Sequence, residues 1–460
     1  MLNIKGKIFK RILCLIFEKS VVSMVVISKP LVAVLFVIGL VIGVAVGYAV
    51  AATIAPPVGP GAVAPTLKGE VPIGALLPLT GVLSSYGEND KVALEFAEKE
   101  INEWLKARGE EWYIKLYVED SATDPKTALD KLMTLHGKGI KFIIGPMSSA
   151  EVSEIKSYAD ANNILVVSQS STSPALAIEG DWIFRYVPTD LVQGPAAARV
   201  AYDQGVRYLV QVWRGDTWGD GLARATREAF LNLLKKTGQT GDVIEGVRYD
   251  PAAKEFSAEA AKLASLITDL VNKYGKDKVG IDAIGFEEMI AFIAAAKAYP
   301  ILSEVKWVGS DGTAGVSGLV KEADLAEFCI KVQFLSPINA PGASPHLEKV
   351  KKAVREKLGR DPEPYAYNSY DGLWTIALAL DMVDKYDSKA VKDILPEVVK
   401  RYYGASGYFE LDAAGDKAFG DYELWIPWRV DGGYDWKIAG IWHGVTDTIE
   451  WAPWWTAAVK

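Results

Sequence analysis

Residues 141–172 read KFIIGPMSSAEVSEIKSYADANNILVVSQSST, and the order of apolar and helical segments in this stretch indicates the fold class. Two short apolar runs, at 141–144 and 164–167, flank a segment of helical period at 150–161. This order is typical of a βαβ unit, in which two parallel strands share one sheet and the helix crosses over between them. We therefore expect these residues to belong to a parallel α/β sheet.

The same alternation continues on both sides of this stretch. Upstream, we expect strands at 73–77 and 113–118 and helices at 90–105 and 125–136. After Pro188 it restarts, with expected strands at 208–212, 243–247, 280–284 and 305–308 and expected helices at 219–236, 256–274 and 287–298. Two such runs predict two doubly wound, Rossmann-like α/β lobes, with a cleft where the carboxyl ends of their strands face one another.

A third passage of the chain completes both lobes. Expected helices at 346–358, 365–385 and 388–402 precede strands rich in aromatic residues between 407 and 443. We expect a first lobe made of residues 71–188 and 313–420 and a second lobe made of residues 189–312 and 421–445. Three hinge crossings would then join the two lobes.

Small hydroxyl residues follow two of the expected strands. GPMSS at 145–149 follows one strand and opens a helix, and SQSSTSP at 168–174 follows the next strand. Such positions bring hydroxyl groups and free backbone N–H groups to a helix N-terminus, where a carboxylate binds readily. We expect Ser148, Ser149, Ser170 and Thr172 to contact a ligand while they also cap local structure.

The N-terminal part of the chain predicts export. Residues 31–52 (LVAVLFVIGLVIGVAVGYAVAA) carry no charge and would form a helix of roughly 33 Å, enough to cross a hydrocarbon core of about 30 Å. The basic segment before them, residues 1–30, orients the N-terminus toward the cytoplasm and the remainder outside. Because Ala49-Val50-Ala51 resembles a signal peptidase site, the segment is either a retained transmembrane anchor or a cleaved signal.

Two further segments flank the lobes. Residues 53–70 contain four prolines and no hydrophobic period, which predicts a semi-extended linker or a loop packed on the body. The tail at 446–460 contains WAPWW at 451–455. This tail either packs on the body as a cover or touches the bilayer interface or a permease.

The composition limits which partners and which kinds of chemistry we expect for this chain. The chain beyond residue 53 has a net charge of −13, which makes nucleic acid an unfavourable partner. The two cysteines, Cys14 and Cys329, lie on opposite sides of the apolar segment, so we expect no structural disulfide. The three histidines are far apart and no nucleophile motif or phosphate loop occurs, so we expect no metal, no cofactor and no enzymatic activity.

The ordered series of motifs resembles a known family, the type I periplasmic binding proteins, in the branch of the leucine/isoleucine/valine-binding protein. The residues that carry the resemblance are IGALLPLTGVLSSYG at 73–87, EFAEKEIN at 95–102, DPKTALDKLMTL at 124–135, FRYVPTDLVQGP at 184–195, KWVGSDG at 306–312, YNSYDGLWTIALAL at 367–380 and LDAAGD at 411–416. The resemblance implies two lobes that close on a small ligand.

The resemblance also implies roles for individual residues. Ser148, Ser149, Ser170 and Thr172 match the loops that hold the ligand's carboxylate in that family. Trp218 stands where family members commonly have Tyr, and Tyr86 matches an aromatic residue that flanks the ligand. GFEEM at 285–289 offers Glu288 first and Glu287 second for the ligand's ammonium, with Phe286 lining the pocket beside them.

We therefore expect an extracytoplasmic solute-binding protein that captures a small amino-acid-like or amide ligand by hinge closure. The resemblance implies delivery of that ligand to the permease and ATPase subunits of an ABC importer. A zwitterion that bridges both lobes favours the closed state, because only closure satisfies both of its ends. The alternative is a membrane-tethered ligand-sensing receptor domain of the same fold.

Overall fold

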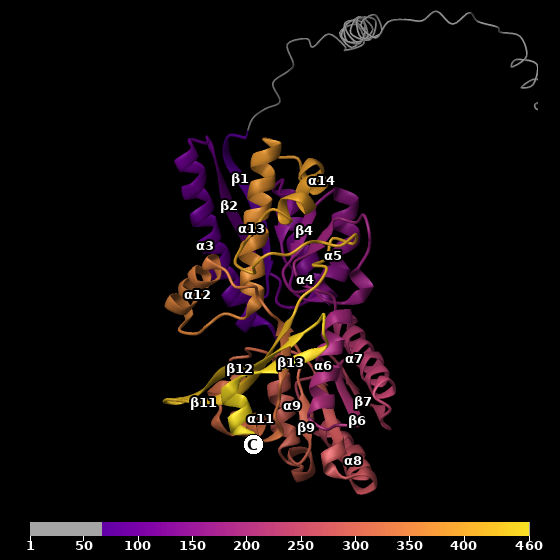
Figure 1. The fold of residues 1–460 in the computed structure, drawn as a ribbon. Helices are drawn as coiled ribbons and strands as arrows, with labels where there is room; N and C mark the ends of the chain where they lie inside the picture. The colour runs from indigo at the N-terminus through magenta and orange to yellow at the C-terminus, as the bar shows by residue number, and fades with distance from the viewer. Residues whose placement is uncertain (1–66, 460) are drawn as a thin grey trace, which may run out of the picture. The chain divides into compact units, whose positions relative to one another are not determined.

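The structure is a computed structural model that describes residues 67–459. These residues form two α/β lobes, one above the other in the view of Figure 1. Both lobes contain a parallel sheet with helices on both of its faces, as the alternating sequence pattern predicts. A fold of this kind places the carboxyl ends of the strands at the edge where ligands bind.

The first lobe is built on a five-stranded parallel sheet of order β2-β1-β3-β4-β5. Its strands β1 and β2 pair over their full length, from Gly69 opposite Trp112 to Leu77 opposite Asp120. All the pairs are parallel because each strand is followed by a crossover segment. The strands are β1 (Gly69–Leu77), β2 (Trp112–Asp120), β3 (Phe142–Ile144), β4 (Leu165–Ser168) and β5 (Ile183–Arg185).

Helices cover both faces of this sheet. One face packs on α3 (Ser84–Arg108), α12 (Pro345–Leu358), α13 (Pro364–Val383) and α14 (Ser388–Val399). The other face packs on α4 (Pro125–Gly137) and α5 (Ser149–Asn162). A short 3-10 turn, η1 (Pro174–Leu176), follows β4. In α3, the apolar side chains of Leu94, Ala97 and Ile101 are fully buried against the sheet.

The second lobe repeats this design with a four-stranded parallel sheet of order β7-β6-β8-β9. Its strands are β6 (Tyr208–Arg214), β7 (Asp242–Tyr249), β8 (Val279–Ile284) and β9 (Lys306–Val308). Helices α6 (Asp190–Asp203) and α7 (Thr217–Lys236) pack in one core, and α8 (Ser257–Tyr274), α9 (Met289–Ala296) and α11 (Ala323–Val332) pack in the other. The shorter elements are η2 (Lys276–Lys278), η3 (Pro300–Ser303) and α10 (Gly318–Lys321).

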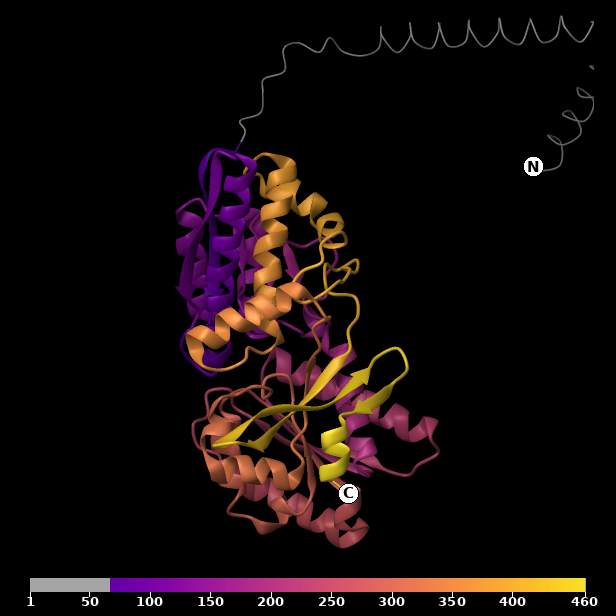
Figure 2. The ribbon, with the colours of Figure 1, turned by 60° about the vertical axis from the view of Figure 1, so that its left-hand side comes forward.

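An antiparallel sheet extends the second lobe. It has the order β10-β11-β12-β13, and a bridge between Val308 and Leu335 links it to the parallel sheet. The long hairpin formed by β11 and β12 is clearest in Figure 2. The strands are β10 (Ser336–Asn339), β11 (Tyr422–Val430), β12 (Gly433–His443) and β13 (Thr448–Trp451), and α15 (Pro453–Ala458) follows them.

The second passage between the lobes occurs later than the expected boundary at residue 313. Leu319 on α10 and Leu325 and Phe328 on α11 are buried in the same core as Trp307 of β9. These apolar side chains attach residues 313–339 to the second lobe, and the chain returns to the first lobe only after β10. The loop that follows KWVGSDG therefore stays beside the second-lobe sheet.

The tryptophan-rich tail packs on the second lobe. Strand β13 pairs with β12, and Trp455 on α15 is buried in the core that α6 and α7 share. Trp451 and Trp454 pack against the same core. This packing agrees with the first alternative for WAPWW, in which the tail packs on the body as a cover.

The expected membrane segment at 31–52 and most of the linker at 53–70 lie outside the residues that the structure describes. Within residues 67–459, no helix combines the length and the apolar character that a membrane crossing requires.

Candidate functional site

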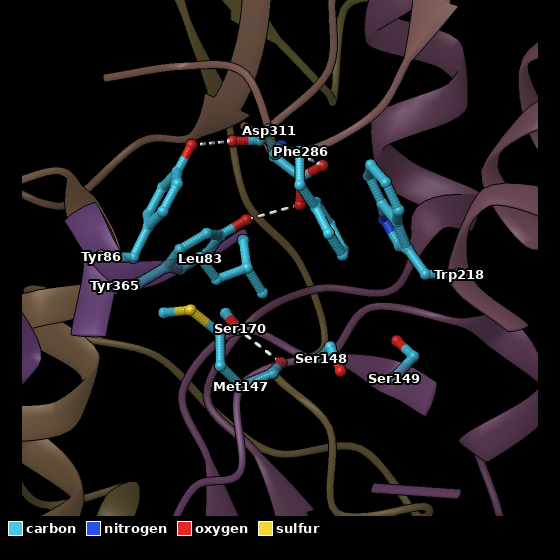
Figure 3. A pocket seen from close by; sticks show the side chains of 11 residues that line it. Leu83, Tyr86, Met147, Ser148, Ser149, Ser170, Trp218, Phe286, Asp311 and Tyr365 are labelled. Atoms are coloured by element: carbon cyan, nitrogen blue, oxygen red, sulfur yellow. Dashed lines mark hydrogen bonds between the residues drawn. The ribbon is translucent and has the colours of Figure 1, made fainter. Parts of the chain in front are cut away.

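A cavity lies between the two lobes, at the carboxyl ends of both parallel sheets. About 290 Å³ of space free of protein atoms lies at this place, including space that is open to solvent. Figure 3 shows serines at the bottom of the view, with Asp311 and Phe286 at the top. The lining residues are Leu83, Tyr86, Met147, Ser148, Ser149, Ser170, Trp218, Phe286, Asp311, Gly312 and Tyr365.

The turn between β3 and α5 brings serines to the floor of the cavity. Gly145 has φ +87°, and a Cβ there would lie 2.1 Å from the carbonyl oxygen of Leu76, so the turn requires glycine. Ser148 caps α5: its hydroxyl donates to Glu151 Oε2 at 2.6 Å and accepts the N–H of Glu151 at 3.3 Å. The Ser148 hydroxyl is therefore used by the capping box.

Ser149 has the hydroxyl that is best placed to donate to a ligand. Its Oγ accepts hydrogen bonds from the Ser171 hydroxyl at 3.2 Å and from the N–H of Ser173 at 3.1 Å. Because both contacts use the oxygen as acceptor, the Ser149 proton remains available to the cavity. The first turn of α5 also leaves the N–H groups of Ser149 and Ala150 without partners in the helix. Together these groups form an anion-binding floor.

The loop after β4 contributes less than predicted. Ser170 lines the cavity, but its hydroxyl donates to the carbonyl oxygen of Met147 at 2.8 Å. Thr172 is buried and does not line the cavity, and its carbonyl oxygen accepts the N–H of Asp190 at 2.8 Å. This backbone bond links the loop to the start of α6, and the predicted contact of Thr172 with a ligand stays a prediction.

Aromatic residues form the second-lobe wall. Asp216 caps α7 by accepting the N–H groups of Trp218 and Gly219, which fixes the turn that carries Trp218. The Trp218 and Phe286 rings stack with centroids 4.5 Å apart and planes inclined by 18°. Both residues line the cavity, as does Tyr86 from the first lobe. The structure therefore brings six predicted residues together: Tyr86, Ser148, Ser149, Ser170, Trp218 and Phe286.

The two predicted acids are not among the residues that line this cavity. Glu288 Oε1 accepts hydrogen bonds from Arg214 Nη1 at 2.9 Å and from the Tyr249 hydroxyl at 3.0 Å. Glu287 Oε1 accepts the N–H of Ser85 at 2.9 Å and so ties the second lobe to the first. Burial raises the pKa of Glu287. Both carboxylates have protein partners at Oε1, and Glu288 Oε2 is buried without a hydrogen-bond partner among the described residues.

Asp311 and Tyr365 are lining residues that the sequence interpretation missed. The Tyr365 hydroxyl donates to Asp311 Oδ2 at 2.5 Å, and Gln193 Nε2 donates to Asp311 Oδ1 at 2.9 Å. Burial raises the pKa of Asp311. The signal that could have indicated Asp311 is its place just past the end of β9, the same kind of position that identified Ser149. Leu83, Met147 and Gly312 complete the lining.

Chemically, the cavity combines an anion-binding floor with aromatic walls. Within residues 67–459, no group of three or more histidine, cysteine or acidic side chains could hold a metal ion. Closed lobes, hydroxyl donors and aromatic walls are features of a site that encloses a small organic solute. The fold and this cavity together define a two-lobed solute-binding protein.

Comparisons with known proteins agree with this class. A family described as periplasmic binding protein matches residues 70–423. The chain is 33% identical over 399 residues to the Methanocaldococcus jannaschii protein MJ1266, covering 83% of this chain and 91% of that one. It is 27% identical over 377 residues to the Leu/Ile/Val-binding protein homolog 1 of Brucella abortus, covering 80% and 93%.

Solved structures share the fold. The leucine-binding protein LivK of Thermotoga maritima superposes with a TM-score of 0.64 at 21% identity, covering 80% of this chain and 97% of that one. The isoleucine complex of LivJ from Streptococcus pneumoniae gives 0.63 at 18% identity, covering 80% and 99%. The chain belongs to the periplasmic binding protein family, and its fold is that of the type I members.

Proposed function

We propose that this protein is an extracytoplasmic solute-binding protein that captures a small amino-acid-like or amide ligand by closing its lobes. The observation that carries the proposal is the anion-binding floor at Ser149, which faces Trp218 and Phe286 across the interlobe cavity. A carboxylate or amide oxygen on this floor would accept the Ser149 hydroxyl and the free N–H groups of α5. The stacked rings would exclude water from the apolar part of the ligand.

Family membership supports the second half of the proposal, which is delivery to an ABC importer. The Streptococcus pneumoniae relative is described as a branched-chain amino acid transporter substrate-binding protein. Closed lobes present a surface that open lobes lack, so a permease can distinguish loaded from empty protein. We include residues 31–52 in the proposal as the membrane anchor of this receptor. The mass of the mature N-terminus, intact or cleaved near Ala51, tests the anchor.

Thermal shift and calorimetry on the purified chain test the ligand class. The panel contains the twenty amino acids, their amides, small carboxylates and several monosaccharides. We expect at least one amino-acid-like, carboxylate or amide compound to raise the melting temperature, by an amount that grows with the logarithm of its concentration above the dissociation constant, because a ligand that binds only the folded state stabilises it. A response to monosaccharides without a response to the other classes would refute the proposed function.

A further inference from the structure

A buried ion pair lies behind the aromatic wall of the cavity. Arg214 and Glu288 are only 7% and 8% exposed, and Arg214 Nη1 donates to Glu288 Oε1. The Arg214 guanidinium also lies over the Phe286 ring, 4.7 Å from its centroid. A ring that lines the cavity therefore packs against the arginine as well. The acid that would bind an ammonium already has a cationic partner inside the protein.

Arg214 also contacts a second acid, Asp216, so its single positive charge lies beside two carboxylates, those of Asp216 and Glu288. Asp216 Oδ1 accepts the N–H groups of Trp218 at 3.1 Å and of Gly219 at 2.9 Å. These groups belong to the N-terminus of the 20-residue helix α7, whose dipole stabilises a negative charge. Because the helix compensates Asp216, the charge of Arg214 remains available to Glu288.

Asp311 is the charged residue among those that line the cavity. Its carboxylate accepts three hydrogen bonds, from Tyr365, Gln193 and the N–H of Gly312. Tyr365 belongs to the first lobe, so its bond to Asp311 also holds the lobes together. An ammonium on Asp311 Oδ2 would compete with the contact that closes the cavity around it.

A buried ammonium is unfavourable unless an anion is free to pair with it. The described lining offers an anion-binding floor, aromatic walls and one acid that is already fully engaged. We propose that the cleft selects a monocarboxylate with an apolar or aromatic body and no ammonium group, and that Arg214 sets this selectivity by pairing with Glu288. This inference rests on the proposed function and narrows it: the ligand's carboxylate binds at Ser149, and the amino-acid-like ligand is one that lacks the ammonium group.

Calorimetry on the full chain with two matched pairs tests the ligand class. The pairs are 4-methylpentanoate with leucine and 3-phenylpropanoate with phenylalanine, whose members differ only in the ammonium group. We expect a dissociation constant at least about tenfold lower for the compound without the ammonium in at least one pair. Equal or tighter binding of the amino acid in both pairs overturns the ligand class and leaves the proposed function standing. If none of the four compounds produces a heat of binding, the proposed ligand class is wrong. If the amides of the panel also show no binding, the proposed function is wrong as well.

Variants test the role of the ion pair itself. Glu288→Gln keeps an oxygen that can accept from Arg214 and Tyr249, so we expect the affinity for both members of a pair to change by less than about threefold. A loss of more than about tenfold that is confined to the amino acid would show that Glu288 binds an ammonium and would overturn the proposal. Arg214→Met should instead raise the affinity for the amino acid relative to its partner by about tenfold, because it frees the Glu288 charge.

Discussion

Ser149 is the residue with the most direct predicted effect on binding. Its oxygen accepts two hydrogen bonds from its own lobe, which leaves its proton for the ligand. We expect Ser149→Ala to weaken binding of the ligand by about tenfold to a hundredfold, the usual cost of losing a hydrogen bond to a charged group. Isothermal titration calorimetry with the best compound of the panel measures this change.

Ser148→Ala is the matched control for this prediction. Ser148 belongs to the capping box of α5, so its removal should lower the free energy of unfolding by about 1 kcal/mol. Affinity should fall by less than about threefold, because the Ser148 hydroxyl already donates to Glu151. A larger loss of affinity for Ser148→Ala than for Ser149→Ala would contradict the assigned roles.

Asp282 gives the second lobe a dependence of stability on pH. This buried residue on β8 accepts a hydrogen bond from Gln211 Nε2 at 2.9 Å, and burial raises its pKa from 3.8 to about 7. The folded state therefore holds a proton that the unfolded state releases. We therefore expect protonated Asp282 to contribute folding stability that is present below pH 4 and is lost as the pH rises through 7, by on the order of 4 kcal/mol.

Asp282→Asn should remove this dependence. The variant should be more stable than the parent at pH 8, and the advantage should shrink as the pH falls toward 4, because the parent is then protonated too. Urea denaturation at pH 5 and pH 8 measures the difference. An equal effect of the substitution at both pH values would show that Asp282 titrates normally.

Several site residues could be predicted from the sequence because they follow strand ends. Ser149 and Ser170 belong to this group, and Trp218 and Phe286 follow β6 and β8 by a few residues. The pairing of Glu288 with Arg214 could not be predicted, because the two are 74 residues apart. Asp311 and Tyr365 are similarly brought together from different lobes. Such pairs depend on packing that no local pattern encodes.

At the scale of elements, a buried ion pair fixes the serine loop after β4. Arg185 at the end of β5 pairs with Asp416, and the two side chains are 0% and 1% exposed. Arg185 Nη1 also donates to the carbonyl oxygens of Ser171 at 3.1 Å and Ser173 at 2.8 Å. The loop that supports Ser149 is thereby anchored to the strand next to it.

Single and double substitutions of the Arg185–Asp416 pair should separate its effect on stability from its effect on ligand binding. Arg185→Met leaves Asp416 buried without a partner and should cost about 3–5 kcal/mol of unfolding free energy. The double variant Arg185→Met with Asp416→Leu should regain most of that stability, yet bind ligand about tenfold more weakly because the loop is no longer held. Denaturation and calorimetry on both variants test this, and parental affinity in the double variant would contradict it.

Elements with a clear period or a clear alternation were predicted, and others were not. Helix α7 and strand β8 lie within a few residues of their expected bounds. Helix α6 was not predicted, because small side chains such as Ala197 and Ala201 bury most of its circumference and leave no polar stripe. Strand β10 was not predicted either, because four residues reading SPIN carry little strand signal on their own.

At the scale of the whole molecule, hydrogen bonds between the lobes support the closed arrangement. The Tyr86 hydroxyl shares its single proton between the carbonyl oxygens of Ala314 at 2.7 Å and Asp311 at 3.0 Å, and the Tyr365 hydroxyl donates to the Asp311 carboxylate. Each of these bonds exists only while the lobes are together. They shift the balance toward closure before the ligand adds its own contacts.

Tyr365→Phe should therefore favour the open arrangement. We expect a larger radius of gyration in the absence of ligand and an affinity about tenfold lower, measured by small-angle scattering and calorimetry. Tyr117→Phe is the matched control, because the Tyr117 hydroxyl also donates to a carboxylate, that of Glu70, but within one lobe. Equal effects of the two substitutions would show that the Tyr365 bond does not couple to closure.

A crystal structure of the protein with the tightest-binding carboxylate or amide of the panel tests directly whether the interlobe cavity binds the ligand at Ser149. We expect closed lobes, with the ligand's oxygen within about 3 Å of Ser149 Oγ and its apolar part against Trp218 and Phe286. A ligand bound outside the interlobe cavity, or one whose oxygen avoids the Ser149 floor, would contradict this expectation.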